Sequence, residues 1–273
     1  MNIGVFDSGL GGLTILKSLL KELPQYHYIY LGDSARVPYG NRSPQVIYEF
    51  TEQAVDFLMR KNCQVVIIAC NTSTSTALKK IQTEYLPKKY PFRRVLGVIK
   101  PVVEELVADH QPLSTKIGVI GTKATVNSKA FVREINKVLP KAKVLQEACP
   151  LLVPFIEDGG KNKKILNLVL SEYLDDLIKS KIDKLILACT HYELIKSEIE
   201  SVVGPKIKVI SEGHLVAKKL KEYLANHPEI ENKLEKNSQA SYYVTDLSQD
   251  YKKLMKLFLG SYLKEEINLL KLG

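Results

Sequence analysis

Residues 65–74 read VVIIACNTST and residues 184–193 read KLILACTHYE, and these two stretches decide the fold. Each runs from a continuous apolar segment through Ala-Cys into a threonine-containing turn and then a helical pattern. Two further segments, NIGVFDSG (2–9) and KIGVIGT (116–122), resemble each other in the same way. A duplicated α/β unit places equivalent strand ends opposite each other, and open α/β sheets bind ligands beyond the carboxyl ends of their strands. The sequence therefore predicts one site between two lobes, with Cys70 and Cys189 contributed by different lobes.

Short apolar runs alternate with amphipathic stretches along the chain. The first half predicts strands at 2–6, 26–33, 64–70 and 93–99, with helical patterns between them at 11–23, 44–61 and 72–86. This alternation predicts an α/β fold with parallel sheets. The continuous apolar character of the strands agrees, because a parallel sheet is buried on both faces. The charged stretch 227–239 predicts a solvated loop or helix end, and residues 240–260 a further strand and helix.

Length and composition are those of an ordinary globular protein. The chain has 273 residues, of which 45% are hydrophobic and 25% charged, a size that needs no disulfide staples. Its four scattered cysteines favour a reducing, cytoplasmic compartment. The N-terminal segment has no basic region, and no run approaches the roughly 18 apolar residues of a membrane span, so we expect neither a secretory leader nor a membrane anchor. The net charge of +9 permits nucleic-acid binding and favours small anionic ligands, but it decides nothing about the fold.

The two repeated cysteines are the first candidates for chemistry. Each is expected to precede a helix, whose N-terminus lowers a thiol pKa and favours the thiolate. The alternative is that both are buried, inert residues. A zinc site or a redox dithiol would need closely spaced cysteines, and a Cys-His hydrolase using Cys189 with His191 would leave Cys70 unexplained. Two thiols facing one ligand from opposite sides suit a two-base proton exchange at a stereocentre.

Other polar turns follow the predicted strands. The glycine-rich turn DSGLGGLT (7–14) places Asp7 and Ser8 at a strand end, but its spacing is not that of a dinucleotide fingerprint. A nucleotide-binding alternative stays open, because Asp33 ends the second strand where a ribose-binding acid would lie. Thr122 and Thr125 follow the strand that opens the second half. Cys63 and Cys149 are interpreted as structural.

Seven segments together resemble the cofactor-independent aspartate/glutamate racemase family. They lie in the expected order over nearly the whole chain: GVFDSGLGGLT (4–14), YLGDSARVPYG (30–40), IIACNTST (67–74), GVIGTKATVNSKAF (118–131), CPLLVPFIEDG (149–159), LACTHY (187–192) and YYVTDLSQDYKKLMKLFLG (242–260). The resemblance implies two pseudo-symmetric lobes, Rossmann-like or flavodoxin-like, with parallel sheets and an active site in the cleft between them. We predict lobe A at 1–97 plus 209–273 and lobe B at 98–208.

The resemblance also implies an activity and a set of roles. It implies interconversion of L- and D-glutamate without pyridoxal phosphate, metal or nucleotide, with Cys70 taking the α-proton of D-glutamate and Cys189 that of L-glutamate. Asp7 would assist Cys70, and His191 would assist Cys189. Asp7 and His191 would also contact the substrate, and Glu157 would lie near Cys189. The remaining matched positions would hold the carboxylates and ammonium of the substrate: Ser8, Pro38, Tyr39, Gly40, Asn71, Thr72, Thr122, Thr125 and Thr190.

Family members supply D-glutamate for bacterial peptidoglycan and often form homodimers, so the resemblance implies a small-molecule substrate, a homodimer, and no membrane or required nucleic-acid partner. Three segments depart from the family pattern: Lys100 in GVIKPVV (97–103), Glu193 where the pattern has proline, and Ser211-Glu212 where it has Asp-Ser. Two alternatives remain, an aspartate racemase of the same family and a nucleotide- or nucleic-acid-binding module. One methylene separates aspartate from glutamate, which is worth only about 1–3 kcal/mol of discrimination.

Overall fold

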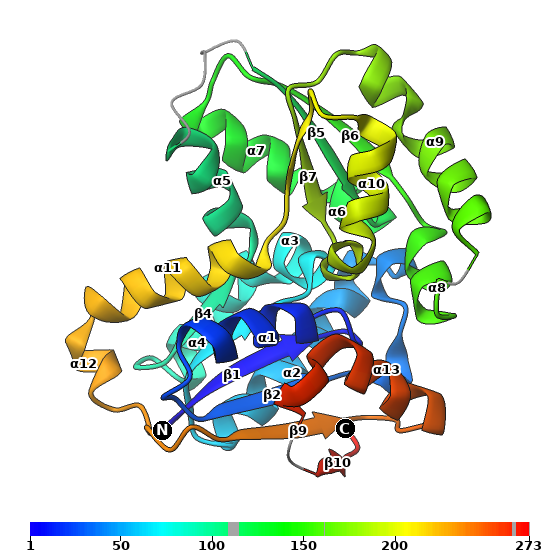
Figure 1. Ribbon diagram of the computed structural model, residues 1–273. Coiled ribbons are helices and arrows are strands. Elements are labelled where there is room, and N and C mark those ends of the chain that lie inside the picture. The colour runs from blue at the N-terminus through cyan, green and yellow to red at the C-terminus, as the bar shows by residue number, and fades with distance from the viewer. Residues whose placement is uncertain (109–114, 161, 264–265, 273) are drawn as a thin grey trace.

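Two parallel sheets form the framework of the molecule (Figure 1). The computed structural model describes residues 1–108, 115–160, 162–263 and 266–272. The larger sheet has the strand order β10-β9-β2-β1-β3-β4 and the smaller sheet the order β6-β5-β7-β8. The strands are β1 Asn2–Asp7, β2 Tyr28–Gly32, β3 Cys63–Ile68, β4 Arg94–Gly97, β5 Lys116–Gly121, β6 Lys143–Ala148, β7 Lys184–Ala188, β8 Lys208–Ile210, β9 Ala240–Val244 and β10 Ile267–Leu269.

The two sheets repeat one topology. In each lobe the first strand lies between the second and the third, and the fourth lies beyond the third: β2-β1-β3-β4 and β6-β5-β7-β8. All pairings between the described strands are parallel. This order is the start of the flavodoxin-like arrangement. The predicted fold class, an α/β protein of two pseudo-symmetric lobes with parallel sheets, is confirmed.

Helices cover both faces of each sheet, which explains why the central strands are largely apolar. Every residue of β1, β3 and β7 is buried. The helices are α1 Leu13–Glu22, α2 Pro44–Arg60, α3 Asn71–Lys80, α4 Leu86–Lys89, α5 Ile99–Ala108, α6 Lys123–Ser128, α7 Ala130–Val138, α8 Leu152–Glu157, α9 Lys163–Lys179, α10 Lys196–Val203, α11 Gly213–Ala225, α12 Pro228–Glu231 and α13 Gln249–Leu259.

Local chemistry sets several helix starts. Pro44 is the first residue of α2, where its missing N–H breaks no helical hydrogen bond, and the hydroxyl of Ser43 caps the helix by accepting from the N–H of Val46 at 3.4 Å.

Residues 227–239 are more ordered than the expected solvated loop. They contain α12, and Ile230 and Leu234 are buried in the core of the larger sheet. Spaced four residues apart in a charged segment, these two side chains were too few to reveal a packed face.

The chain passes between the lobes twice, once after β4 and once after β8. The predicted boundary at 208/209 falls inside β8, which pairs with β7 in the smaller sheet. The following helix α11 packs against α1 of the other lobe and lies beside it in Figure 1. Within the described residues, no helix has the length and apolar character needed to span a membrane.

Candidate active site

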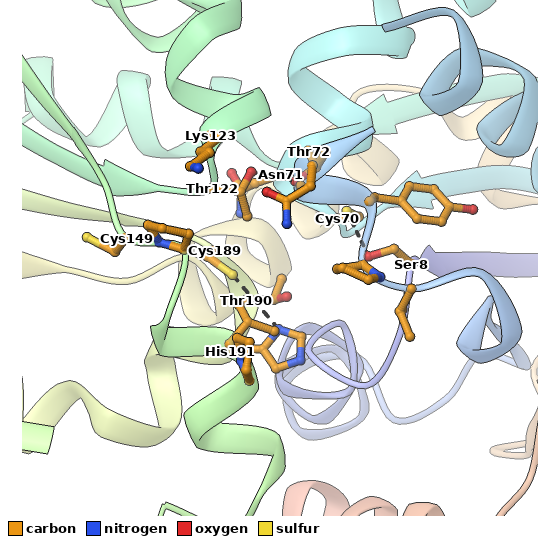
Figure 2. A pocket seen from close by; sticks show the side chains of 18 of the residues that line it. Ser8, Cys70, Asn71, Thr72, Thr122, Lys123, Cys149, Cys189, Thr190 and His191 are labelled. Atoms are coloured by element: carbon orange, nitrogen blue, oxygen red, sulfur yellow. Dashed lines mark hydrogen bonds between the residues drawn. The ribbon is translucent and has the colours of Figure 1, made fainter. Parts of the chain in front are cut away.

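A cavity of about 180 Å³ lies between the lobes, at the carboxyl ends of the central strands. This is smaller than the roughly 300–1,000 Å³ of pockets for drug-sized ligands, and it suits a small metabolite. Figure 2 shows Ser8 and Cys70 on one side of it and Cys189 and His191 on the other. Twelve of the fourteen predicted site residues line this cavity: Ser8, Pro38, Tyr39, Gly40, Cys70, Asn71, Thr72, Thr122, Glu157, Cys189, Thr190 and His191.

Cys70 follows β3 and occupies the N-cap position of α3. Its side chain is 5% exposed, and Sγ lies 3.3 Å from the hydroxyl oxygen of Ser8. Burial raises the pKa of the Cys70 thiol, and the Asp7 carboxyl group raises it further, while hydrogen bonds from Ser8 and the backbone N–H of Ser73 oppose this. The expectation of a lowered pKa is therefore wrong for Cys70, because desolvation outweighs the helix N-terminus.

Cys189 follows β7 and is 7% exposed, but the segment after it is a 3-10 helix at Thr190–Ile195 rather than an α-helix. Its Sγ lies 3.8 Å from Nδ1 of His191, and Nε2 of His191 lies 2.9 Å from Oε1 of Glu157. Burial raises the pKa of Cys189 well above its usual value, the backbone N–H of His191 opposes this, and Cys70 adds to the rise. The expected lowering is wrong here too. Cys70 thus acts on the pKa of Cys189, although the two thiols come from different lobes.

Asp7 lies behind the cavity wall rather than on it. It is 1% exposed, and its Oδ2 accepts from the N–H of Gly9 at 2.9 Å. Burial raises the pKa of Asp7, while His191 lowers it. The Asp7 carboxyl group raises the pKa of Cys70, so Asp7 influences the site through that thiol.

The glycine-rich turn brings the lobes into contact. A Cβ on Gly11 would fall against the hydroxyl of Thr190 and within 2.5 Å of Nδ1 of His191. Gly40 plays the same part in the 35–43 loop, since its Cβ would lie 2.8 Å from Cβ of Thr122. These glycines make room for the opposite lobe, whereas a dinucleotide turn makes room for a pyrophosphate.

Asp33, the acid that a nucleotide site would use on ribose, is already engaged. Its carboxylate accepts from Nε of Arg36 at 2.7 Å, from the hydroxyl of Thr245 at 2.8 Å and from the phenol of Tyr39. Tyr39 is thereby anchored in the cavity wall, 2% exposed. Asp33 is therefore not free to bind a ribose, which removes the acid that the nucleotide-binding alternative would use.

Three threonines join the lobes on the remaining side. The hydroxyls of Thr72 and Thr122 lie 2.9 Å apart, and those of Thr122 and Thr125 lie 3.0 Å apart. Thr125 is fully buried and lies outside the cavity lining, where it orients Thr122. Within the described ranges, no cluster of three or more His, Cys, Asp or Glu side chains could hold a metal ion.

A family model described as Asp/Glu/Hydantoin racemase matches residues 3–220. The chain belongs to this family. A glutamate racemase from Aquifex aeolicus (strain VF5) is 39% identical over 267 residues, covering 98% of this chain and 97% of its own length.

Solved racemases resemble this structure to different extents. A glutamate racemase from Francisella tularensis, solved in complex with D-glutamate, matches with a TM-score of 0.88 and 35% identity over 99% of this chain and 97% of its own. An aspartate racemase from Picrophilus torridus matches with a TM-score of 0.56 and 16% identity over 82% of this chain and 95% of its own. The second likeness extends to the fold alone.

The racemase cavity also contains residues that the sequence did not single out. Cys149, interpreted as structural, lines it together with Lys123, an exposed cation at the start of α6. Cys149 follows β6 just as Asp33 follows β2, and their N–H groups donate to the carbonyls of Gly121 and Asp7 respectively. The place of Cys149 just beyond the end of β6 is the signal that could have identified it, because ligands bind at that edge of a parallel sheet. Cys63 lies apart, at the start of β3, where it is buried against Gly4.

Proposed function

We propose that the protein is a glutamate racemase that interconverts L- and D-glutamate by a two-thiol mechanism without a cofactor. The observation that carries this proposal is the pair of buried thiols, Cys70 and Cys189, at equivalent strand ends of one small cavity. Polar side chains around them, including Asn71, Thr72 and Thr190, suit the carboxylates and ammonium of an amino acid.

In the proposed reaction, one thiolate removes the α-proton and the other thiol delivers a proton to the opposite face. Cys70 acts on D-glutamate and Cys189 on L-glutamate, so the protonation states of the two sulfurs are exchanged after each turnover. Burial favours the neutral thiols, and the positive ammonium group of a bound substrate would favour the thiolate that the reaction needs. Asp7 and Ser8 serve Cys70, while His191 serves Cys189 and is oriented by Glu157.

The carbon acid is weak, so its developing negative charge needs fixed donors in a desolvated site. The hydroxyls of Thr72, Thr122 and Thr190 line the cavity from both lobes and are candidates for this task. The prediction that Thr125 contacts the substrate becomes a proposal that it supports Thr122.

The decisive experiment follows the α-proton. Purified protein with reduced thiols is incubated with L- or D-glutamate in D2O, and we expect deuterium at the α-carbon together with formation of the other enantiomer. Absence of both exchange and inversion would overturn the proposal. Aspartate is assayed in parallel, since turnover of aspartate in preference to glutamate would assign the aspartate racemase alternative.

The cellular setting is proposed on the family resemblance. The protein would act in the cytoplasm, supply D-glutamate for peptidoglycan and form a homodimer. The four cysteines are free, as in a reducing compartment. Light scattering of the purified protein measures the oligomeric state directly.

A further inference from the structure

Two of the three departures from the family pattern lie side by side in the structure. Glu193 belongs to the 3-10 helix after Cys189, and Glu212 is the residue before α11. Both line a narrow recess beside Cys189 and Thr190. Glu193 is exposed, whereas Glu212 is 3% exposed. A carboxyl group therefore lies buried at the junction of the lobes, where the family pattern has serine.

Glu212 contacts a residue that lines the active site. Its Oε2 accepts a hydrogen bond of 2.7 Å from Nδ2 of Asn71, the residue that follows Cys70 and lines the cavity. None of the ion pairs in the described part of the chain includes Glu212, and its Oε1 has no hydrogen-bond partner there. Burial raises the pKa of Glu212 well above its usual value, with Glu193 adding to the rise and the Asn71 bond opposing it. Burial therefore favours the protonated form of this carboxyl group.

This bond decides which end of the Asn71 amide is left for a ligand. An amide side chain has an NH₂ donor at one end and a carbonyl acceptor at the other. Because Nδ2 is committed to Glu212, the end left over is Oδ1, which is buried without a hydrogen-bond partner among the described residues. Oδ1 of Asp7, the carboxyl group that acts on Cys70, is also a buried acceptor without such a partner. Of these two acceptors, Oδ1 of Asn71 belongs to a residue that lines the cavity, so it can meet a cationic donor on a ligand.

We propose that Glu212 is a positioning residue that holds the Asn71 amide with Oδ1 available to accept from the ammonium group of the bound amino acid. The proposal rests on the proposed glutamate racemase activity for the identity of the ligand. It assigns Glu212 a share in recognising the α-amino group, although Glu212 itself does not line the cavity.

The test compares two ligands that differ in the amino group. Racemic glutamate, whose composition an active racemase leaves unchanged, and glutarate, which lacks the ammonium, are titrated calorimetrically into each variant. Glu212→Met removes the acceptor at similar length, and we expect it to weaken glutamate binding about tenfold and glutarate binding less than about twofold. Glu212→Gln keeps a neutral carbonyl acceptor, and it should keep both affinities within about threefold of the wild type.

Glu193→Gln is the matched control, because it removes the neighbouring exposed carboxylate without touching Asn71, and both affinities should stay unchanged. Equal weakening of the two ligands by Glu212→Met, or no weakening of either, would overturn the positioning role. So would a Glu212→Gln variant that loses as much glutamate affinity as Glu212→Met, and this isosteric variant decides the matter if the Met variant does not fold. Failure of the proposed function would appear separately, as absent α-proton exchange in a wild type that still prefers glutamate to glutarate.

Discussion

The two halves of the molecule share a backbone plan and differ in the groups that serve their thiols. Both place a cysteine after the third strand of a β2-β1-β3-β4 or β6-β5-β7-β8 sheet. Cys70 lies beside a hydroxyl and a carboxyl group, those of Ser8 and Asp7, which follow from β1. Cys189 lies beside the imidazole of His191, which comes from its own 3-10 helix and bonds Glu157.

The difference teaches that the repeated backbone fixes the positions of the two thiols, whereas the side chains around each thiol fix its proton chemistry. Gly121 ends the first strand of lobe B at the place where Asp7 ends that of lobe A, so the second lobe has no acid at this position. Lobe B therefore draws its assisting group from the turn after its cysteine. Two thiols in equivalent places are expected to differ in how each gains and loses a proton.

The largest effect should come from removing one thiol. Cys70→Ala or Cys189→Ala should slow racemisation about 10³-fold or more, because one face of the substrate loses its acid or base. The remaining thiol still reaches one enantiomer. In D2O, Cys70→Ala should exchange the α-proton of L-glutamate without inversion, and Cys189→Ala that of D-glutamate, as measured by NMR and chiral chromatography.

Cys149→Ser is the matched control for these variants, because Cys149 lines the same cavity and is directed to the carbonyl oxygen of Glu147 at 3.9 Å. Its activity should stay within about threefold of the wild type, the range of a change that leaves the reacting groups in place. A large loss of activity in Cys149→Ser would show that a third thiol takes part in the reaction, and it would contradict the comparison of one thiol from each lobe.

A smaller effect is expected from the imidazole. His191→Asn should lower kcat/KM about 10- to 100-fold. The loss must be equal in both directions, since the equilibrium constant between enantiomers is one. The asymmetry appears instead in the α-deuterium isotope effect, which should rise for L-glutamate and fall for D-glutamate as proton transfer at Cys189 becomes limiting. Ser8→Ala, the matched change beside Cys70, should give the opposite pattern. Identical isotope effects in the two variants would contradict the separate roles.

The smallest effect is expected from Asp7→Asn, at about tenfold in kcat/KM. The Asp7 carboxyl group raises the pKa of Cys70, so its removal lowers that pKa and makes the thiolate available at lower pH. The ascending limb of the pH profile of kcat/KM should therefore move to lower pH. Glu157→Gln is the comparison variant, since Glu157 serves the imidazole of the other lobe. A limb that moves to higher pH in Asp7→Asn would show that Asp7 acts on Cys70 in another way.

Sequence patterns predicted the repeated α/β plan because the buried strands are short apolar runs that stand out from the amphipathic helices between them. VVII and KLILA are short and almost continuously apolar, a length that favours a strand, and the polar turns after them mark the strand ends. β10 was not predicted, since its three residues, Ile267–Leu269, form a strand only by pairing with β9. The 3-10 helix after Cys189 likewise depends on lobe packing, and the residues THYELI show no pattern that distinguishes it from an α-helix.

The site could be predicted as a set of residues, but its layering and electrostatics could not. Asp7 and Thr125 lie behind the lining because Cys70 and Thr122 occupy the space in front of them, which is a matter of depth rather than spacing. The thiol pKa values depend on desolvation, and burial by the opposite lobe is invisible in a local motif. Glu193 and Glu212 were seen as separate departures, and only the fold brings them together.

The repeated strand order also has a meaning for ancestry. A polypeptide of about half this length, carrying one Ala-Cys turn, would need only to pair with its own copy to set identical cysteines across a shared space. Fusion of the two copies into one chain would then free each half to change independently. The two halves now differ in the groups beside their thiols: Asp7 and Ser8 on one side, and His191 and Glu157 on the other.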